Sequence, residues 1–426
     1  MVKDAYRNSR VLSIIEAALE YFVAILISGA YLAKVTSEIG LNDRMTALLT
    51  ALVQFGYCFQ LCSLFITNNR PVKGWITILN ALNMLFFAAV YVVPFITIST
   101  AGKGIVLAVF LLLAYFMQNV ASAPKLVWTL SLVDDNKRGD YTANKEIVSL
   151  VGGVIFSFLI GLVIDYYDAV GDVNSSFLFC GIGILGLTVI HTVVMLFMKE
   201  KPRKAEEKKP IKGVLLSLLK DKNLFKIMLI SVLWNVAYCA TIPFYGTYQI
   251  KELGFTMTFV SILSVLYTIF RSVASKPLGK YADKHSFSKM LNICFIIHMF
   301  AFAVNIFTVP ANGMIFYTLY HILSAVAMAG INGGLANLLY GNVEESKRVG
   351  AIAVQSVISG LVGFLTTYLV GLLVEYIQGN DNTLFGIPVY AQQVVSLLGV
   401  VMVAITLLYM NTVVKEKDKK EQTNEN

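Results

Sequence analysis

Ionisable side chains inside long apolar stretches are the residues of this sequence best suited to chemistry. Glu16 and Glu20 lie four residues apart in the first apolar stretch, so they share one face of a helix. Arg271 interrupts another such stretch, and Lys125 follows Pro124 in a third. Placing a charged group at the centre of a membrane costs roughly 2.5–3.5 kcal/mol on insertion scales, so each of these residues is a functional candidate.

A carboxylate near a cation inside a membrane is suited to taking up and releasing a proton, because burial and pairing act on its charge in opposite directions. Glu20 and Arg271 lie deepest within their stretches and are the leading candidates for ion coupling. Arg271 could instead bind an anionic group of a solute. For Lys125, Lys145 and Glu146 the alternative is snorkelling to the nearby inner surface.

Uncharged polar residues form a second set of candidates. Asn119, Asn235 and Asn332 place amides in three apolar stretches, where they could bind solute hydroxyls or bond between helices. His298 and His321 are single histidines, for which we predict packing roles rather than proton relay.

Motifs for enzymatic chemistry are absent from the sequence. There is no G-x-x-x-x-G-K-[ST] phosphate loop, no H-E-x-x-H and no G-x-S-x-G. The five cysteines lie within apolar stretches, and none forms a C-x-x-C pair. We therefore expect no catalytic residues, no metal site and no cofactor. A membrane-embedded enzyme, the rival from another class, would need a convergent catalytic set.

The apolar stretches are long enough to cross a membrane as helices. Hydrophobic residues make up 57% of the 426 residues, and charged residues only 14%. The mean hydropathy is +0.70. A hydrocarbon core of about 30 Å needs about 20 apolar residues per helix. Twelve spans are predicted, at about 11–33, 44–66, 75–97, 104–128, 143–165, 175–198, 226–248, 257–277, 289–309, 314–340, 350–375 and 389–412.

The distribution of basic residues predicts the orientation of these spans. The segment from Lys199 to Lys226 is dense in lysine and lies near the middle of the chain. By the positive-inside rule it is cytoplasmic, as are both termini. This also accounts for the net charge of +8 without a nucleic-acid partner. We expect an N-terminal bundle at 1–198, a basic linker at 199–225, a C-terminal bundle at 226–414 and a charged tail at 415–426.

The two halves of the chain resemble each other. Shifting the sequence by 210 residues places the loop and span from Val133 to Tyr166 on Val343 to Tyr376 without a gap. A shift of 214 aligns Tyr31 with Tyr245 and the segment from Glu38 with that from Glu252. Such self-similarity indicates an internal repeat of six spans.

Small residues recur every four positions in the two matched spans. Residues at this spacing share one helix face, and small ones let a neighbouring helix approach closely. The glycines predicted to serve helix packing are Gly153 and Gly161 in the first half and Gly363 and Gly371 in the second.

The loop between predicted spans 8 and 9 carries a short motif, which adds to the evidence from the repeat and the topology. Gly279, Asp283 and Lys284 fit the start of the pattern G-x-x-x-D-[RK]-x-G-[RK]-[RK]. Ser286 replaces its second glycine, and only Lys289 stands for the trailing bases. The loop between spans 2 and 3 lacks the aspartate. In this motif and in its twelve spans, the chain resembles the bacterial-type major facilitator superfamily (MFS). The resemblance implies an all-α fold of two pseudo-symmetric six-helix bundles, with the substrate site between the halves.

Charged residues at the predicted inner ends of the spans are candidates for a cytoplasmic gate. Such contacts can hold one conformation and break in the other; the alternative is that these charges only set topology. The candidates are Gly279, Asp283 and Lys284, together with two matching clusters, Asp134, Asp135, Lys137 and Arg138 in the first half and Glu344, Glu345, Lys347 and Arg348 in the second.

These patterns predict a secondary active transporter of the cell membrane that moves a small solute by alternating access, coupled to protons or sodium. We expect it to be a monomer in the lipid bilayer. Uptake of a solute and efflux of amphipathic drugs remain alternatives within transport. A non-transporting sensor built on the same scaffold is the alternative outside it.

Overall fold

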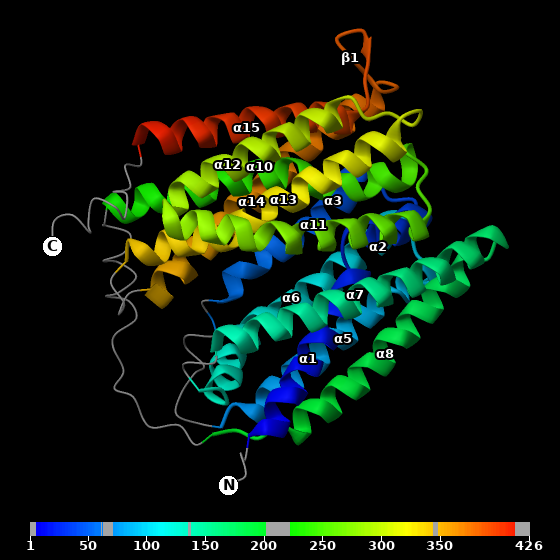
Figure 1. The fold of residues 1–426 in the computed structure, drawn as a ribbon. Helices are drawn as coiled ribbons and strands as arrows, with labels where there is room; N and C mark the ends of the chain where they lie inside the picture. The colour runs from blue at the N-terminus through cyan, green and yellow to red at the C-terminus, as the bar shows by residue number, and fades with distance from the viewer. Residues whose placement is uncertain are drawn as a thin grey trace. The chain divides into compact units, whose positions relative to one another are not determined.

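The computed structural model describes residues 6–60, 62, 71–134, 138–201, 222–343 and 348–413, most of which are helical (Figure 1). Within these ranges, eleven helices are long and apolar enough to cross a membrane. Each of them coincides with one of the predicted spans. The remaining predicted span, 44–66, contains α3 (Asp43–Gly56) and the short helix η1 (Tyr57–Phe59), and its last part lies outside the described residues.

The first half of the chain begins with a span that is interrupted. α1 (Arg7–Leu26) ends two residues before α2 (Gly29–Ile39), where the predicted span 11–33 was continuous. Gly29 has a φ of 53°, a conformation that glycine adopts without steric cost. The other helices of this half are α5 (Lys73–Val90), the short η2 (Val93–Phe95), α6 (Thr100–Ser131), α7 (Arg138–Ala169) and α8 (Val173–Phe197).

The second half contains one helix with a π-helical end and one small hairpin. α10 (Lys222–Thr247) continues into the π-helical turn η4 (Tyr248–Glu252). The hairpin pairs β1 (Thr383–Leu384) with β2 (Ile387–Pro388) and projects beyond the ends of its neighbouring helices (Figure 1). The remaining helices are α11 (Met257–Lys284), α12 (Phe287–Ile306), α13 (Gly313–Gly341), α14 (Arg348–Gly379) and α15 (Ala391–Val413).

The chain divides into two compact units. The first comprises Met1–Lys209 together with Phe255–Ser261, and the second comprises Pro210–Gly254 together with Ile262–Asn426. The first turn of α11 therefore belongs to the first unit. Asp165 of α7 accepts hydrogen bonds from the backbone N–H groups of Met257 (2.8 Å) and Thr258 (2.7 Å) in that turn.

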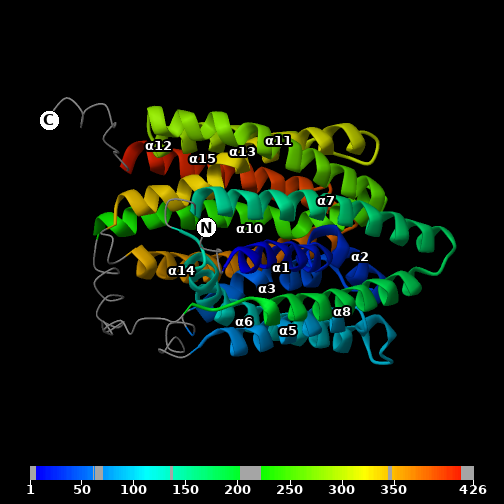
Figure 2. The same cartoon turned by 60° about the horizontal axis from the view of Figure 1, so that its bottom comes forward.

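The same packing scheme occurs in both units. In the first, α1 packs against α7 and α8, and α5 packs against α6 and α8. In the second, α10 packs against α14 and α15, and α12 packs against α13 and α15. Figure 2 shows α12, α13 and α15 lying together. Each of these four contacts of the first unit has its counterpart in the second. The predicted pair of pseudo-symmetric bundles is therefore confirmed.

Two of the predicted packing glycines occupy equivalent contacts. A Cβ atom on Gly153 would collide with the ring of Tyr21 and lie 3.1 Å from Ile25. One on Gly363 would collide with the amide of Asn235 and lie 2.8 Å from the sulfur of Cys239. Tyr21 and Ile25 become Asn235 and Cys239 at a shift of 214 residues, while the glycines differ by 210. The shift of 210 residues therefore relates one side of this helix contact, and the shift of 214 residues relates the other side. Gly161 allows a similar approach by the first turn of α11, and Gly371 is buried on α14.

The outward faces of the helices are apolar. On α7, Val151, Ile155, Leu159 and Leu162 have exposed fractions of 54%, 58%, 56% and 45%. In water such a stripe would destabilise the fold, whereas lipid tails solvate it. The chain is a multi-pass membrane protein.

Candidate functional site

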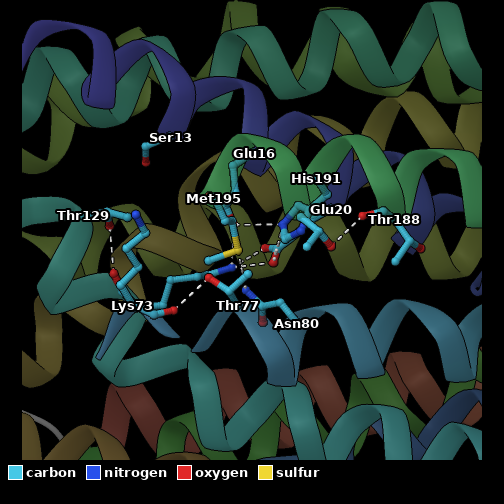
Figure 3. A network of polar contacts seen from close by, with 12 residues as sticks. Ser13, Glu16, Glu20, Lys73, Thr77, Asn80, Thr129, Thr188, His191 and Met195 are labelled. Atoms are coloured by element: carbon cyan, nitrogen blue, oxygen red, sulfur yellow. Dashed lines mark hydrogen bonds and ion pairs between the residues drawn. The ribbon is translucent and has the colours of Figure 1, made fainter. Parts of the chain in front are cut away.

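Polar side chains follow one another on α1 from Ser9 to Glu20, on a side of the helix that lies within the first unit. Ser9, Ser13 and Glu16 are all buried, at 2%, 0% and 0% exposure, and Glu20 follows one turn further along. Residues at this spacing follow one side of a helix. The predicted shared face of Glu16 and Glu20 is confirmed, since both carboxylates contact the same partners (Figure 3).

Lys125 of α6 bridges the two carboxylates. Its Nζ lies 2.9 Å from Oε1 of Glu16 and 2.5 Å from both oxygens of Glu20. The side chains of Glu16, Lys125 and Glu20 are 1%, 15% and 28% exposed. The snorkelling alternative for Lys125 is therefore wrong, because two carboxylates within the bundle hold its ammonium group. The cation beside Glu20 is this lysine.

His191 of α8 completes the cluster and was not among the sequence candidates. Its Nε2 lies 3.4 Å from Oε1 of Glu16 and 3.4 Å from Oε1 of Glu20, and its side chain is fully buried. The sequence contained a signal, because His191 is the one histidine of the sixth predicted span. Nothing in its local spacing links it to a pair of glutamates more than 170 residues away. The charge cluster consists of Glu16, Glu20, Lys125 and His191.

Contacts between α1, α6 and α8 hold these three helices together near the end that we expect to be cytoplasmic. Trp128 of α6 donates a hydrogen bond to the carbonyl of Lys199 (3.0 Å), just after α8, and the N–H of Lys199 donates to Ser9 of α1 (2.9 Å). The apolar core around Trp128 also contains Ala121 of α6 and Met195 of α8. Lys125 and His191 therefore project from helices that are locked side by side.

A few neutral polar groups surround the cluster (Figure 3). Tyr141 of α7 donates a hydrogen bond to Ser13 (2.7 Å), one turn before Glu16. Asn80 of α5 is buried and donates to the sulfur of Met195 (3.6 Å). In these contacts α5 and α7 thus present uncharged side chains.

The charges of the cluster do not cancel unless it binds a proton. Two carboxylates and one ammonium sum to −1 when His191 is neutral, and to zero when His191 or one carboxylate is protonated. Oε2 of Glu16 and Nδ1 of His191 are buried and have no hydrogen-bond partner among the described residues. A buried net charge is unfavourable, so the arrangement favours the uptake of one proton.

The same side chains resemble a donor set for a metal ion. One ligand atom each from Glu16, Glu20 and His191 lies within 4.8 Å of the others. Carboxylates and imidazole are ligands that transition metals accept. However, the ammonium group of Lys125 already occupies the position between the two carboxylates. We therefore interpret the group as a charge cluster with an internal cation.

The other membrane-embedded candidates lie outside this cluster. Asn119 is buried on α6 and donates to the carbonyl of Tyr115 (2.9 Å). Asn235 donates to the carbonyl of Ser359 (2.5 Å), which joins α10 to α14, and Asn332 is exposed on α13. Arg271 is partly buried on α11, in the second unit.

The predicted gate residues are described only in part. Gly279, Asp283 and Lys284 are exposed on the last turns of α11, and Asp134 is exposed after α6. Arg138 and Arg348 begin α7 and α14. Asp135, Lys137, Glu344, Glu345 and Lys347 lie outside the described residues.

Of the two histidines singled out in the second half, His298 packs as predicted. It is fully buried, and its ring lies 4.9 Å from that of Trp234 and 4.5 Å from that of Phe302. His321 lies against Tyr317 (5.0 Å) and Tyr320 (5.3 Å). Neither histidine faces a carboxylate in these contacts, unlike His191.

Comparison with known families decides what kind of protein carries this cluster. The sequence model of the Major Facilitator Superfamily matches residues 12–367 and, in a second match, 240–425. The chain belongs to the Major Facilitator Superfamily. This membership agrees with the paired six-helix units, and it confirms the family resemblance seen in the sequence. No curated protein matches the chain in sequence.

Solved structures of the superfamily share the fold at low sequence identity. The nucleoside transporter NupG is 14% identical with a TM-score of 0.72, over 96% of this chain and 100% of its own. A D-xylose-proton symporter is 14% identical with a TM-score of 0.73, over 97% and 99% of the two chains. The xylose transporter XylE from E. coli, in an inward-open conformation, is 12% identical with a TM-score of 0.68, over 96% of each chain. At such identities the likeness establishes the MFS fold.

Proposed function

We propose that the chain is a proton-coupled secondary transporter that moves a small solute by alternating access. The observation that supports this most strongly is the charge cluster. Four ionisable side chains from three membrane-spanning helices meet within hydrogen-bond or ion-pair distance. Isolated charges are costly in a membrane, so a grouped set of this kind marks an ion pathway by default.

In this proposal Glu20 is the residue that exchanges its proton with the solvent. Its side chain is 28% exposed, whereas those of Glu16 and His191 are 1% and 0% exposed. Protonation removes the attraction between Glu20 and Lys125 and changes the sum of the cluster charges from −1 to zero. A site whose pairing depends on a proton can favour one conformation of a transporter when loaded and another when empty.

Proton coupling also occurs among the structural neighbours. One of them is a D-xylose-proton symporter, and another is a nucleoside transporter. These names describe those proteins, and their substrates are not carried over to this chain. Members of one superfamily place different chemistry on the same scaffold, so the coupling must be argued from the residues of the cluster.

The orientation of the chain in the membrane, as predicted from its basic residues, forms part of the proposal. We place both termini and the linker 199–225 on the cytoplasmic side, in a monomer of the cell membrane. Bundles at 1–198 and 226–414 would rock about a central site. Reporter fusions after residue 200 and after residue 254 test this, since only the first should report a cytoplasmic location.

The functional test is solute-dependent proton movement in proteoliposomes. With a panel of sugars, amino acids, organic anions and lipophilic cations, at least one solute should change the internal pH with wild-type protein and not with Glu20→Gln. Glu38→Gln is the matched control, because Glu38 pairs with Lys34 (3.5 Å) outside the cluster and its loss should leave proton movement intact.

Other results of this assay point to the alternatives. A response to lipophilic cations only would indicate drug efflux. A response that requires sodium instead of a pH change would transfer the coupling to sodium. Binding of a solute by folded protein without flux of either ion would contradict transport and favour a sensor.

A further inference from the structure

We infer that the solute carries a carboxylate, and that this group binds Lys125 in the place that Glu20 occupies in this structure. The inference rests on the proposed function, because it assigns a substrate class to the same cluster. Its basis is the unequal exposure of the two glutamates, together with the number of donors on the lysine.

Glu16 and Glu20 hold the same ammonium group but differ in accessibility. Glu16 is 1% exposed and also lies 3.4 Å from the buried His191, so it is a fixed partner within the bundle. Glu20 is 28% exposed and binds Lys125 through both oxygens at 2.5 Å. Glu20 is therefore the partner that a group entering from solvent can replace.

The contacts of Lys125 define what such a group must be. An ammonium group has three donors and no acceptor, and among the described residues the Nζ of Lys125 contacts carboxylate oxygens of Glu16 and Glu20. If Glu20 leaves unreplaced, an ammonium group whose side chain is 15% exposed loses one of its two carboxylate partners, which is strongly unfavourable. An incoming carboxylate reproduces the lost contacts with the same charge and geometry.

A proton accompanies the exchange. When the displaced Glu20 takes up one proton, one carboxylate of the cluster has been replaced by another, and its total charge is unchanged. This holds whatever the charge of His191. The groups that face Glu20 and its partner are Glu16 on α1, Lys125 on α6 and His191 on α8, while α7 contributes the neutral Tyr141 beside Ser13. One carboxylate and one proton should therefore bind together.

A cationic solute fits the cluster less well. The side of both glutamates that faces the cluster is already occupied by Lys125, at 2.9 and 2.5 Å. The unpartnered oxygen of Glu16 is buried, so it does not offer an open second site. An amine that approached Glu20 would lie next to the lysine and be repelled by it.

Calorimetry on the purified protein tests the inference without any need for flux. The probes are monocarboxylates, including aliphatic, aromatic, sugar-acid and amino-acid members, each compared with its neutral amide and with the amine of the same size. Titrations in two buffers with different heats of ionisation count the protons taken up on binding. We expect at least one carboxylate to bind with the uptake of about one proton, and its amide to bind at least tenfold more weakly.

Substitutions distinguish the binding of the carboxylate by Lys125 from the uptake of the proton by Glu20. Glu20→Gln mimics the protonated, displaced glutamate, so it should keep carboxylate binding but take up no proton. Lys125→Ala should weaken carboxylate binding about tenfold to hundredfold, as expected for the loss of a hydrogen bond between charged groups. Glu38→Gln should resemble the wild type in both measurements.

The inference is overturned if an amine or amide binds while no carboxylate of the panel does, or if Lys125→Ala binds the carboxylate as tightly as the wild type. Should Lys125→Ala not be recovered folded, the comparison of carboxylate, amide and amine on the wild type decides the matter alone. Carboxylate binding with proton uptake but no flux would contradict the transport proposal and leave this inference standing. Proton flux driven only by neutral solutes would contradict this inference and leave the transport proposal standing.

Discussion

At the scale of single residues, the charge cluster concentrates the properties that distinguish this chain from a passive membrane scaffold. Glu16 and His191 are sealed within the bundle, Lys125 joins them to Glu20, and Glu20 reaches accessible space. In the proposed mechanism, the buried residues keep a cation in place, and the accessible glutamate exchanges its partner. Stability and function should therefore respond differently to substitutions at the two ends of the cluster.

Removing the lysine should destabilise the protein. In Lys125→Ala two carboxylates, one of them 1% exposed, would share one helix face without a cation. Breaking a buried ion pair in this way costs on the order of 3 kcal/mol, measured as a lower melting temperature in detergent. The control is Lys34→Ala, since the Asp168 partner of Lys34 is 50% exposed and such pairs contribute about 1 kcal/mol or less. Equal effects of the two substitutions would contradict the burial argument.

His191 should matter for coupling more than for folding. In His191→Gln an amide can still donate to the glutamates, but it cannot take up a proton. If the histidine shares the coupling proton with Glu20, the variant should exchange solute across the membrane while its accumulation depends less steeply on pH. His298→Gln is the comparison, because that ring packs among aromatic side chains in the second unit. A pH dependence identical to the wild type would restrict the proton to the glutamates.

At the scale of helices, the contacts between α1 and α7 and between α10 and α14 fix the geometry of each unit through glycine. Gly153 and Gly363 occupy equivalent positions where a Cβ atom would collide with the opposite helix. Because lipid supplies no hydrophobic drive for helix association, these close approaches carry much of the packing. α1 in turn carries both glutamates, so the glycine contact on α7 also positions the cluster.

Filling the glycine contact should loosen the bundle. Gly363→Ala places a methyl group against Asn235 and Cys239 and should cost about 1–3 kcal/mol, seen as a lower melting temperature. Gly183→Ala on α8 is the matched control, since a Cβ atom there meets nothing within 4 Å. Alanine is the better helix former by about 1 kcal/mol, so the control should be unchanged or slightly more stable. Destabilisation by the control as well would show that helix propensity, and not packing, governs the effect.

The sequence predicts the elements and three of the four residues of the cluster, but it does not predict that these residues meet. Hydropathy located the spans because lipid requires long apolar helices, and the repeat predicted two bundles because the matching segments are nearly gap-free. Glu16 and Glu20 were paired by local spacing. Lys125 and His191 join them through contacts between α1, α6 and α8, which no local period encodes. Arg271 and Glu20 are both deep within their predicted spans, but Arg271 lies on α11, in the second unit.

At the scale of the whole molecule, the chain combines two copies of one helical unit that differ in chemistry. The cluster lies in the first unit, while in the second unit Trp234 of α10, the counterpart of α1, contacts the ring of His298 on α12, which in turn contacts Phe302. At the shift of 214 residues Trp234 stands at the position of Glu20, and the adjacent Asn235 donates to the backbone of Ser359. An ancestral repeat has thus kept its packing and diverged in its buried polar residues, which places the proposed ion coupling in one half.

The last turns of α11 carry Asp283, a candidate gate residue whose role concerns the whole molecule. Asp283 is exposed in this structure, and we propose that it closes the cytoplasmic side in the opposite conformation. Asp283→Asn should then slow solute transport severalfold while solute affinity in detergent changes little. Lys280→Gln, on the same exposed stretch, is the control for a mere change of surface charge. An unaltered transport rate would leave Asp283 with a role in topology only.

The central claim is that Glu20 carries the coupling proton, and concentrative transport tests it most directly. Proteoliposomes with an imposed pH gradient should accumulate the solute against its own gradient with wild-type protein. With Glu20→Gln the same solute should still exchange between the two sides at equal concentrations, but a pH gradient should no longer drive its accumulation. If Glu20→Gln concentrates the solute as well as the wild type does, the proton is carried elsewhere and the account is contradicted.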